Sequence, residues 1–132
     1  MEKVAREEIG QWLLEILSFC QEYDGITSRI TGSGEGGPGE YRGALAEGEL
    51  PALLDRLRRM SVPPDAQCQS ITKYLEDGIS ARIRAEAVTA EFAGSSYDKN
   101  LSASRALWLS ASRTCLDNMI KGLALLRERY KI

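Results

Sequence analysis

The chain of 132 residues contains no histidine. This absence excludes the serine–histidine and cysteine–histidine pairs of many hydrolases, HExxH zinc sites and the Glu-x-x-His di-iron sites of helical bundles. The three cysteines, Cys20, Cys68 and Cys115, fit no metal-ligand spacing. We therefore expect no metal and no cofactor, and the sequence argues against an enzyme.

The same cysteines bear on the compartment in which the protein works. An odd, sparse set of cysteines is typical of a reducing compartment, where each one is a small apolar core residue. Helical spacing leaves a Cys20–Cys115 disulfide as the one pairing that is geometrically open, but we expect free thiols. We therefore predict a cytoplasmic protein; the alternative is an exported domain in which Met1 replaces a removed signal peptide.

Long apolar runs are also lacking. Glu15 interrupts the run that contains Leu13 and Leu17, so no stretch approaches the ~18 residues of a membrane helix. The net charge of -2 is too small to attract nucleic acid or an anionic membrane. The sequence therefore predicts no membrane insertion and no nucleic-acid partner.

Apolar residues recur at helical spacing in four segments, and these segments dominate the chain. We predict helices at about 4–24, 50–60, 64–93 and 100–130. Gly25 is a natural stop for the first helix, although the residues up to Ile30 can add another turn. The break at Pro63-Pro64 predicts that the third helix begins with a proline at or near its first position.

Five glycines between Gly32 and Gly39 predict a flexible loop at about 31–48. This stretch contains a GxGxxG pattern, which in dinucleotide-binding proteins follows a strand and opens a helix. Here a predicted helix precedes the pattern and Pro38-Gly39 follows it. We therefore interpret the pattern as low complexity and not as a nucleotide site.

Together these segments predict one all-α domain over residues 1–132, an antiparallel up-down helical bundle with three long helices and one short helix. The Gly-rich loop joins the first helix to the second. Gly78 lies on the apolar face of the third helix and predicts a close approach by a neighbouring helix. A dry core is expected around Ile71, Leu75, Leu123 and Leu126. The outline resembles small bacterial helical-bundle proteins, but no specific motif carries the resemblance and it implies no residue role.

Three charged residues depart from a plain bundle. Arg82 and Glu86 are four residues apart on the apolar face of the third helix, and an antiparallel hairpin brings Arg105 opposite them. The sequence therefore predicts a polar layer near the turn between the last two helices. This layer is either an internal ion-pair network that sets helix register or a site for an anion or a small ligand.

The leading functional hypothesis is a non-enzymatic helical-bundle module for interaction or assembly. The second helix is much shorter than its neighbours, which predicts an apolar groove beside it for a protein partner or a homodimer. The alternative is a sensor bundle that binds a small ligand or an anion through inward-facing Arg82, Glu86 and Arg105. A third and weaker hypothesis is nucleic-acid binding through the cluster of Arg56, Arg58 and Arg59 and the basic tail of Arg127, Arg129 and Lys131.

Overall fold

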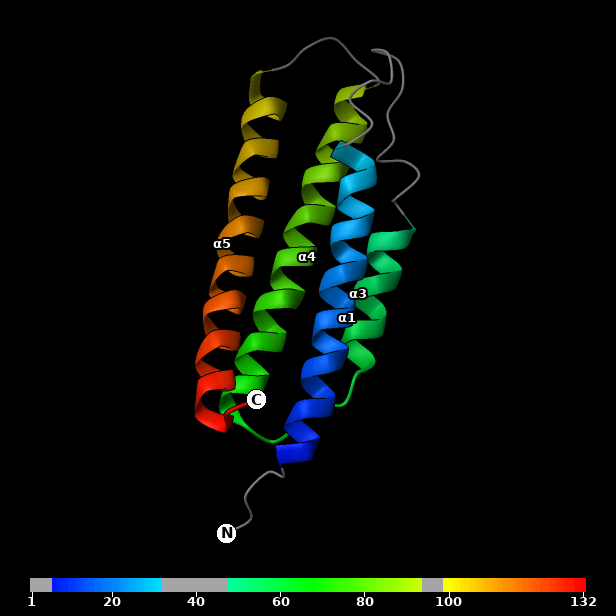
Figure 1. Cartoon of the computed structure of the whole chain (residues 1–132). Coiled ribbons are helices and arrows are strands. Elements are labelled where there is room, and N and C mark those ends of the chain that lie inside the picture. The colour runs from blue at the N-terminus through cyan, green and yellow to red at the C-terminus, as the bar shows by residue number, and fades with distance from the viewer. Residues whose placement is uncertain (1–5, 32–47, 94–98) are drawn as a thin grey trace.

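The computed structural model describes residues 6–31, 48–93 and 99–132, without the side chains of residues 29–31, 89–93 and 99–102. Over these ranges the chain forms four helices and no strand: α1 (Arg6–Thr31), α3 (Glu49–Arg59), α4 (Ala66–Ala93) and α5 (Lys99–Tyr130). The helices lie side by side and run alternately up and down (Figure 1). The predicted all-α bundle of three long helices and one short helix is confirmed. The predicted Gly-rich loop lies almost wholly outside the described residues.

The first helix is longer than the predicted segment 4–24. It passes through Gly25 and ends at Thr31. Tyr23 and Ile26 are both buried, so the additional turns remove apolar surface from water. This burial outweighs the ~1 kcal/mol that a glycine inside a helix costs relative to alanine. The predicted helix end at residue 24 was therefore wrong, whereas the alternative of a further turn up to Ile30 is confirmed.

The start of α4 also differs from the prediction. Both prolines precede the helix, and Asp65 caps it. The Asp65 Oδ1 atom accepts hydrogen bonds from the backbone N–H groups of Gln67 at 2.9 Å and Cys68 at 3.2 Å. Aspartate is a favoured N-cap because its carboxylate satisfies donors that have no partner within the helix.

The hairpin of α4 and α5 is the most closely packed pair of helices in the bundle. Two glycines allow this approach, one from each helix. A Cβ atom at Gly78 would lie 2.8 Å from Leu116 Cδ2, and one at Gly122 would lie 2.9 Å from Ile71 Cγ1. The predicted close approach at Gly78 is confirmed, and Gly122 adds a second contact of the same kind.

The core lies between α4 and the other three helices. The predicted dry region is buried, with Ile71, Leu75, Leu123 and Leu126 at most 8% exposed. The short helix α3 adds four buried leucines, Leu50, Leu53, Leu54 and Leu57. Each helix of the described residues is too short or too polar to span a lipid bilayer.

The border between α1 and α5 is the loosest side of the bundle. The α1 helix packs mainly on α3 and α4, and it meets α5 through a few side chains. The Cys20 Sγ atom lies 3.9 Å from Met119 Sδ, and Arg6 donates a hydrogen bond to the Lys131 carbonyl oxygen. We call this border the α1/α5 seam and define it by Leu13, Leu14, Leu17 and Cys20 of α1 and by Leu116, Met119, Ile120 and Leu123 of α5.

Candidate functional site

The structure brings together the three charged residues that the sequence singled out. The Arg82 Nε atom donates a hydrogen bond of 2.9 Å to Glu86 Oε2 along α4, and Arg105 Nη2 of α5 lies 3.9 Å from the same oxygen. The side chains of Arg82 and Glu86 are 12% and 6% exposed, and that of Arg105 is 34% exposed. The layer therefore links α4 to α5, and the Glu86 carboxylate is buried near the guanidinium groups of Arg82 and Arg105.

One donor of this layer has no acceptor. Among the residues that the structure describes, Arg82 Nη2 and Trp12 Nε1 are buried nitrogens without a hydrogen-bond partner. A buried donor without an acceptor costs about 1–3 kcal/mol, which makes such atoms rare in folded proteins. The Arg82 nitrogen is consequently the group in this layer that an added acceptor would satisfy.

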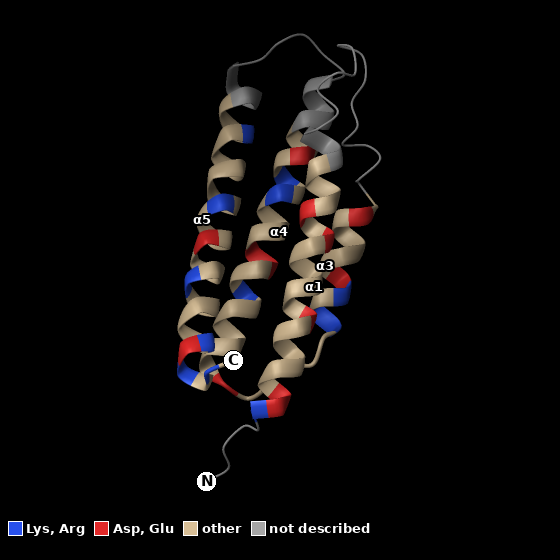
Figure 2. Ribbon diagram, viewed as in Figure 1, with Lys and Arg blue, Asp and Glu red and all other residues tan. Residues whose placement is uncertain are grey.

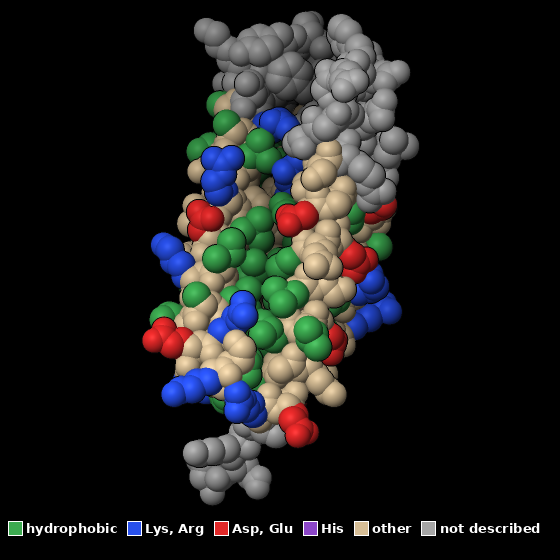
Figure 3. Space-filling view, in the orientation of Figure 1, with side chains coloured by type: hydrophobic (Ala, Val, Ile, Leu, Met, Phe, Trp, Pro, Cys, Tyr) green, Lys and Arg blue, Asp and Glu red, His purple; other side chains and the backbone are tan. Residues whose placement is uncertain are grey.

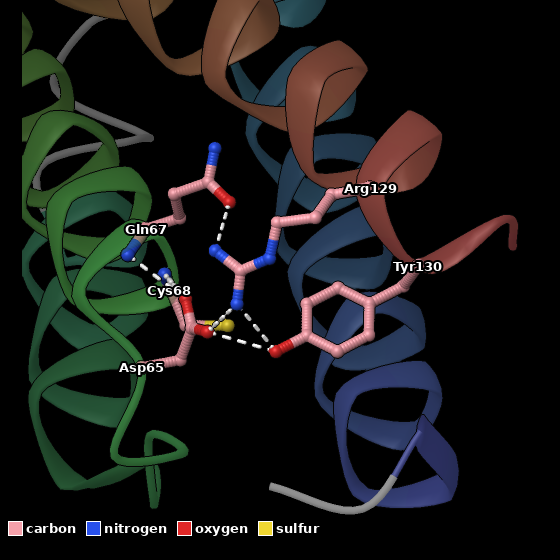
Figure 4. A network of polar contacts seen from close by, with 5 residues as sticks. All are labelled: Asp65, Gln67, Cys68, Arg129 and Tyr130. Atoms are coloured by element: carbon pink, nitrogen blue, oxygen red, sulfur yellow. Dashed lines mark hydrogen bonds and ion pairs between the residues drawn. The ribbon is translucent and has the colours of Figure 1, made fainter. Parts of the chain in front are cut away.

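A second polar cluster joins the start of α4 to the end of α5 (Figure 4). Besides capping α4, Asp65 uses its Oδ2 atom to accept hydrogen bonds from Arg129 and, at 2.9 Å, from the Tyr130 hydroxyl. Arg129 also donates to Gln67 Oε1 at 2.6 Å. We call Asp65, Gln67, Arg129 and Tyr130 the end latch.

Charge and burial act in opposite directions on the carboxylate of the end latch. Burial by itself raises the pKa of Asp65. Hydrogen bonds from Tyr130, the Cys68 N–H and Arg129, together with the charge of Arg129, outweigh burial and lower the pKa below its usual value. Sequence reasoning missed this cluster, although an aspartate directly before a helical segment is a recognisable N-cap signal.

The cysteines are all free thiols in the structure. Burial and the nearby charge of Asp24 raise the pKa of Cys20 to about 11, and burial and the charge of Asp65 raise that of Cys68 to about 12. Burial also raises the pKa of Cys115. These thiols are therefore protonated near neutral pH and are poor nucleophiles.

The arginine cluster at the end of α3 is held in ion pairs. Arg56 contacts Glu22 at 2.6 Å, Arg58 contacts Glu76 at 3.3 Å and Arg59 contacts Asp55 at 3.0 Å. A phosphate backbone would have to compete with these carboxylates for the guanidinium groups. Each of the three guanidinium groups thus already has a carboxylate partner within the bundle.

Hydrophobic side chains gather in a strip between α5 and α1, along the α1/α5 seam (Figure 3). Leu14, Leu17 and Ile120 are 69%, 39% and 58% exposed, and they flank the nearly buried Leu13 and Leu123. The other strongly exposed large hydrophobic residues of the described chain are Tyr74, Leu107 and Leu125, and none is on α3. Three of these six exposed residues, Leu14, Leu17 and Ile120, therefore lie at the seam. The groove that the sequence predicted beside the short helix stays a prediction, because the segment before α3 lies outside the described residues.

No family model, curated protein or solved structure matches this chain. Among the described residues, no three carboxylate or thiol side chains lie close enough together to hold a metal ion. The features that remain are the α1/α5 seam, the polar layer at Arg82 and the end latch.

The two helices that border the seam carry opposite charge (Figure 2). Between Arg6 and Thr31, α1 has five acidic and two basic residues. Between Lys99 and Tyr130, α5 has six basic and two acidic residues. The apolar strip is thus bordered by an acidic helix on one side and a basic helix on the other.

Proposed function

We propose that this chain is a non-enzymatic helical interaction and assembly module that binds a partner along the α1/α5 seam. The observation that carries the proposal is the exposure of Leu14, Leu17 and Ile120 beside a nearly buried apolar strip. Contiguous exposed apolar surface is favourable to bury, and a groove between two helices accepts the apolar face of a third helix.

The absence of histidine and the high thiol pKa values support a role other than catalysis. The absence of disulfides among the three cysteines supports a reducing, cytoplasmic compartment. The ion pairs of Arg56, Arg58 and Arg59 support a partner other than nucleic acid.

The proposal is tested by comparing three immobilised forms of the chain in an extract of the cells that make it. The forms are the wild type, the seam variant Leu17→Glu/Ile120→Glu, and the control Leu125→Glu, in which an exposed leucine outside the seam is changed. We expect the wild type and the control to retain the same partner, which the seam variant loses. The purified partner should then bind the seam variant at least about tenfold more weakly. Equal retention by all three forms would contradict the proposal.

A second candidate function rests on Arg82 Nη2, which is buried and has no acceptor among the described residues. We propose that an oxygen of a small anion, such as a carboxylate or phosphate, binds this nitrogen within the polar layer. A thermal-shift titration with acetate, sulfate and phosphate tests the idea. Stabilisation that saturates in the wild type and disappears in Arg82→Met supports it, and the same shift in both proteins opposes it.

A further inference from the structure

The antiparallel directions of α1 and α5 determine which of their residues share a level of the bundle. Two contacts set this register: Cys20 Sγ lies beside Met119 Sδ, and Arg6 bonds to the Lys131 carbonyl. Both helices rise about 1.5 Å per residue, so each step forward along α1 matches one step backward along α5. The levels of other residues on the seam follow from these two contacts.

In this register, two pairs of exposed residues lie at the same height along the bundle, one residue on each side of the seam. The first pair is Leu17 and Ile120. The second pair, Asp24 and Arg113, lies two helical turns away. Because seven residues make nearly two turns, Asp24 lies on the same flank of α1 as Leu17, and Arg113 on the same flank of α5 as Ile120. Neither Asp24 nor Arg113 has an ion-pair partner among the described residues.

A second copy of the chain can face the seam through a twofold axis in two ways. A twofold axis perpendicular to the helices places α5 of one copy against α5 of the other and α1 against α1, which brings like charges together. An axis parallel to the helices places α1 of each copy against α5 of the other, antiparallel, with opposite charges facing. The charge distribution therefore favours the parallel axis.

We infer that the partner of the α1/α5 seam is a second copy of this chain, related by a twofold axis parallel to the helices. Leu17 then packs against Ile120 of the partner subunit, and Asp24 pairs with Arg113 of the partner subunit. The symmetry repeats each contact, so four helices close around one apolar layer. This inference rests on the proposed function of the seam and specifies its partner.

Sedimentation equilibrium of the purified full chain, from about 1 μM to about 1 mM, tests the inference. We expect a reversible dimer whose dissociation constant rises about a hundredfold in Leu17→Glu, because each dimer buries the new charge twice. Asp24→Arg and Arg113→Asp should each raise the constant about tenfold through like-charge contacts. The double variant Asp24→Arg/Arg113→Asp should restore it to near the wild-type value, because the swapped charges again face opposite charges.

The control Leu125→Glu should leave the dimer unchanged, and circular dichroism should show that every variant keeps its helix content. A wild type that stays monomeric throughout, or a charge swap that does not restore the dimer, would overturn the inference. If a different protein is nevertheless retained from the extract in a seam-dependent way, the proposed function stands and only its partner is wrong. If the wild type is monomeric and no protein from the extract is retained through the seam, the inferred dimer and the proposed function of the seam are both wrong.

Discussion

The Tyr130 hydroxyl at the end of α5 donates a hydrogen bond of 2.9 Å to the Asp65 carboxylate, which caps the start of α4. One carboxylate thus holds two elements together, because it satisfies the first N–H groups of α4 and anchors the end of α5. The end latch closes the α4–α5 hairpin at the end opposite to its connecting turn (Figure 1).

Replacing Asp65 by alanine should therefore destabilise the protein more than an ordinary surface substitution. Loss of an aspartate N-cap alone costs about 0.5–2 kcal/mol in the free energy of unfolding, and the contacts with Arg129 and Tyr130 are lost as well. Urea denaturation measures the change. Asp117→Ala, at an exposed position on α5, is the matched control and should change stability by less than about 0.5 kcal/mol. Equal effects of the two substitutions would show that the latch does not stabilise the fold.

The lowered pKa of Asp65 makes the latch sensitive to acid. Its contribution is fully present above the pKa of the unfolded chain, which is about 3.9 for aspartate, and is lost as the pH falls through the lower pKa of the folded state. Stability measured by urea between pH 6 and pH 2 should therefore fall less steeply in Asp65→Asn than in the wild type. Parallel pH profiles of stability for the two proteins would show that the ionised Asp65 carboxylate does not stabilise the fold.

Glu86 is expected to be the most sensitive residue of the polar layer. Its replacement by alanine leaves Arg82 buried without its carboxylate partner, a change that typically costs about 3 kcal/mol. The double variant Arg82→Met/Glu86→Leu removes both charges and should recover much of this loss. Denaturation of both variants tests the layer, and a loss below about 0.5 kcal/mol in Glu86→Ala would indicate that the charge is not buried.

Substitution of two helical glycines should have opposite effects. At Gly25 no atom of the described chain beyond the adjoining residues and the local helix backbone lies within 4 Å of an added Cβ, so Gly25→Ala should raise stability by about 0.5–1 kcal/mol through helix propensity. At Gly78 the added Cβ meets Leu116 at 2.8 Å inside the tightest helix contact, and Gly78→Ala should lower stability by about 1 kcal/mol. Thermal and urea unfolding should show changes of opposite sign in the free energy of unfolding of the two variants. A gain in stability for Gly78→Ala would mean that α4 and α5 do not pack closely at this position.

The three thiols should react slowly in the native protein. At pH 8 a thiol with a pKa of about 11 or 12 contains very little thiolate, and Cys68 is also fully buried. Alkylation followed by mass spectrometry should modify no thiol rapidly in the native state and all three after denaturation without reductant. Fewer than three modified thiols in denaturant would indicate a disulfide and would contradict the free cysteines of the structure.

Much of this fold is a local property of the sequence. Helical spacing of apolar residues located all four helices and the buried positions of Ile71, Leu75, Leu123 and Leu126, because a helix repeats every 3.6 residues whatever it packs against. The layer of Arg82, Glu86 and Arg105 was also predictable, because it needs only the i, i+4 spacing and the register of one hairpin.

The remaining features depend on contacts between distant parts of the chain. The burial of Ile26 in the core stabilises α1 beyond Gly25, although the low helix propensity of glycine opposes this extension. The end latch joins residues 64 and 65 positions apart, and the contact of Cys20 with Met119 spans 99 positions. Helical periodicity shows which face of a helix is apolar but not which neighbour covers it. The sequence by itself therefore determined the helices and their apolar faces, whereas only the tertiary packing decided that the border between α1 and α5 stays partly uncovered.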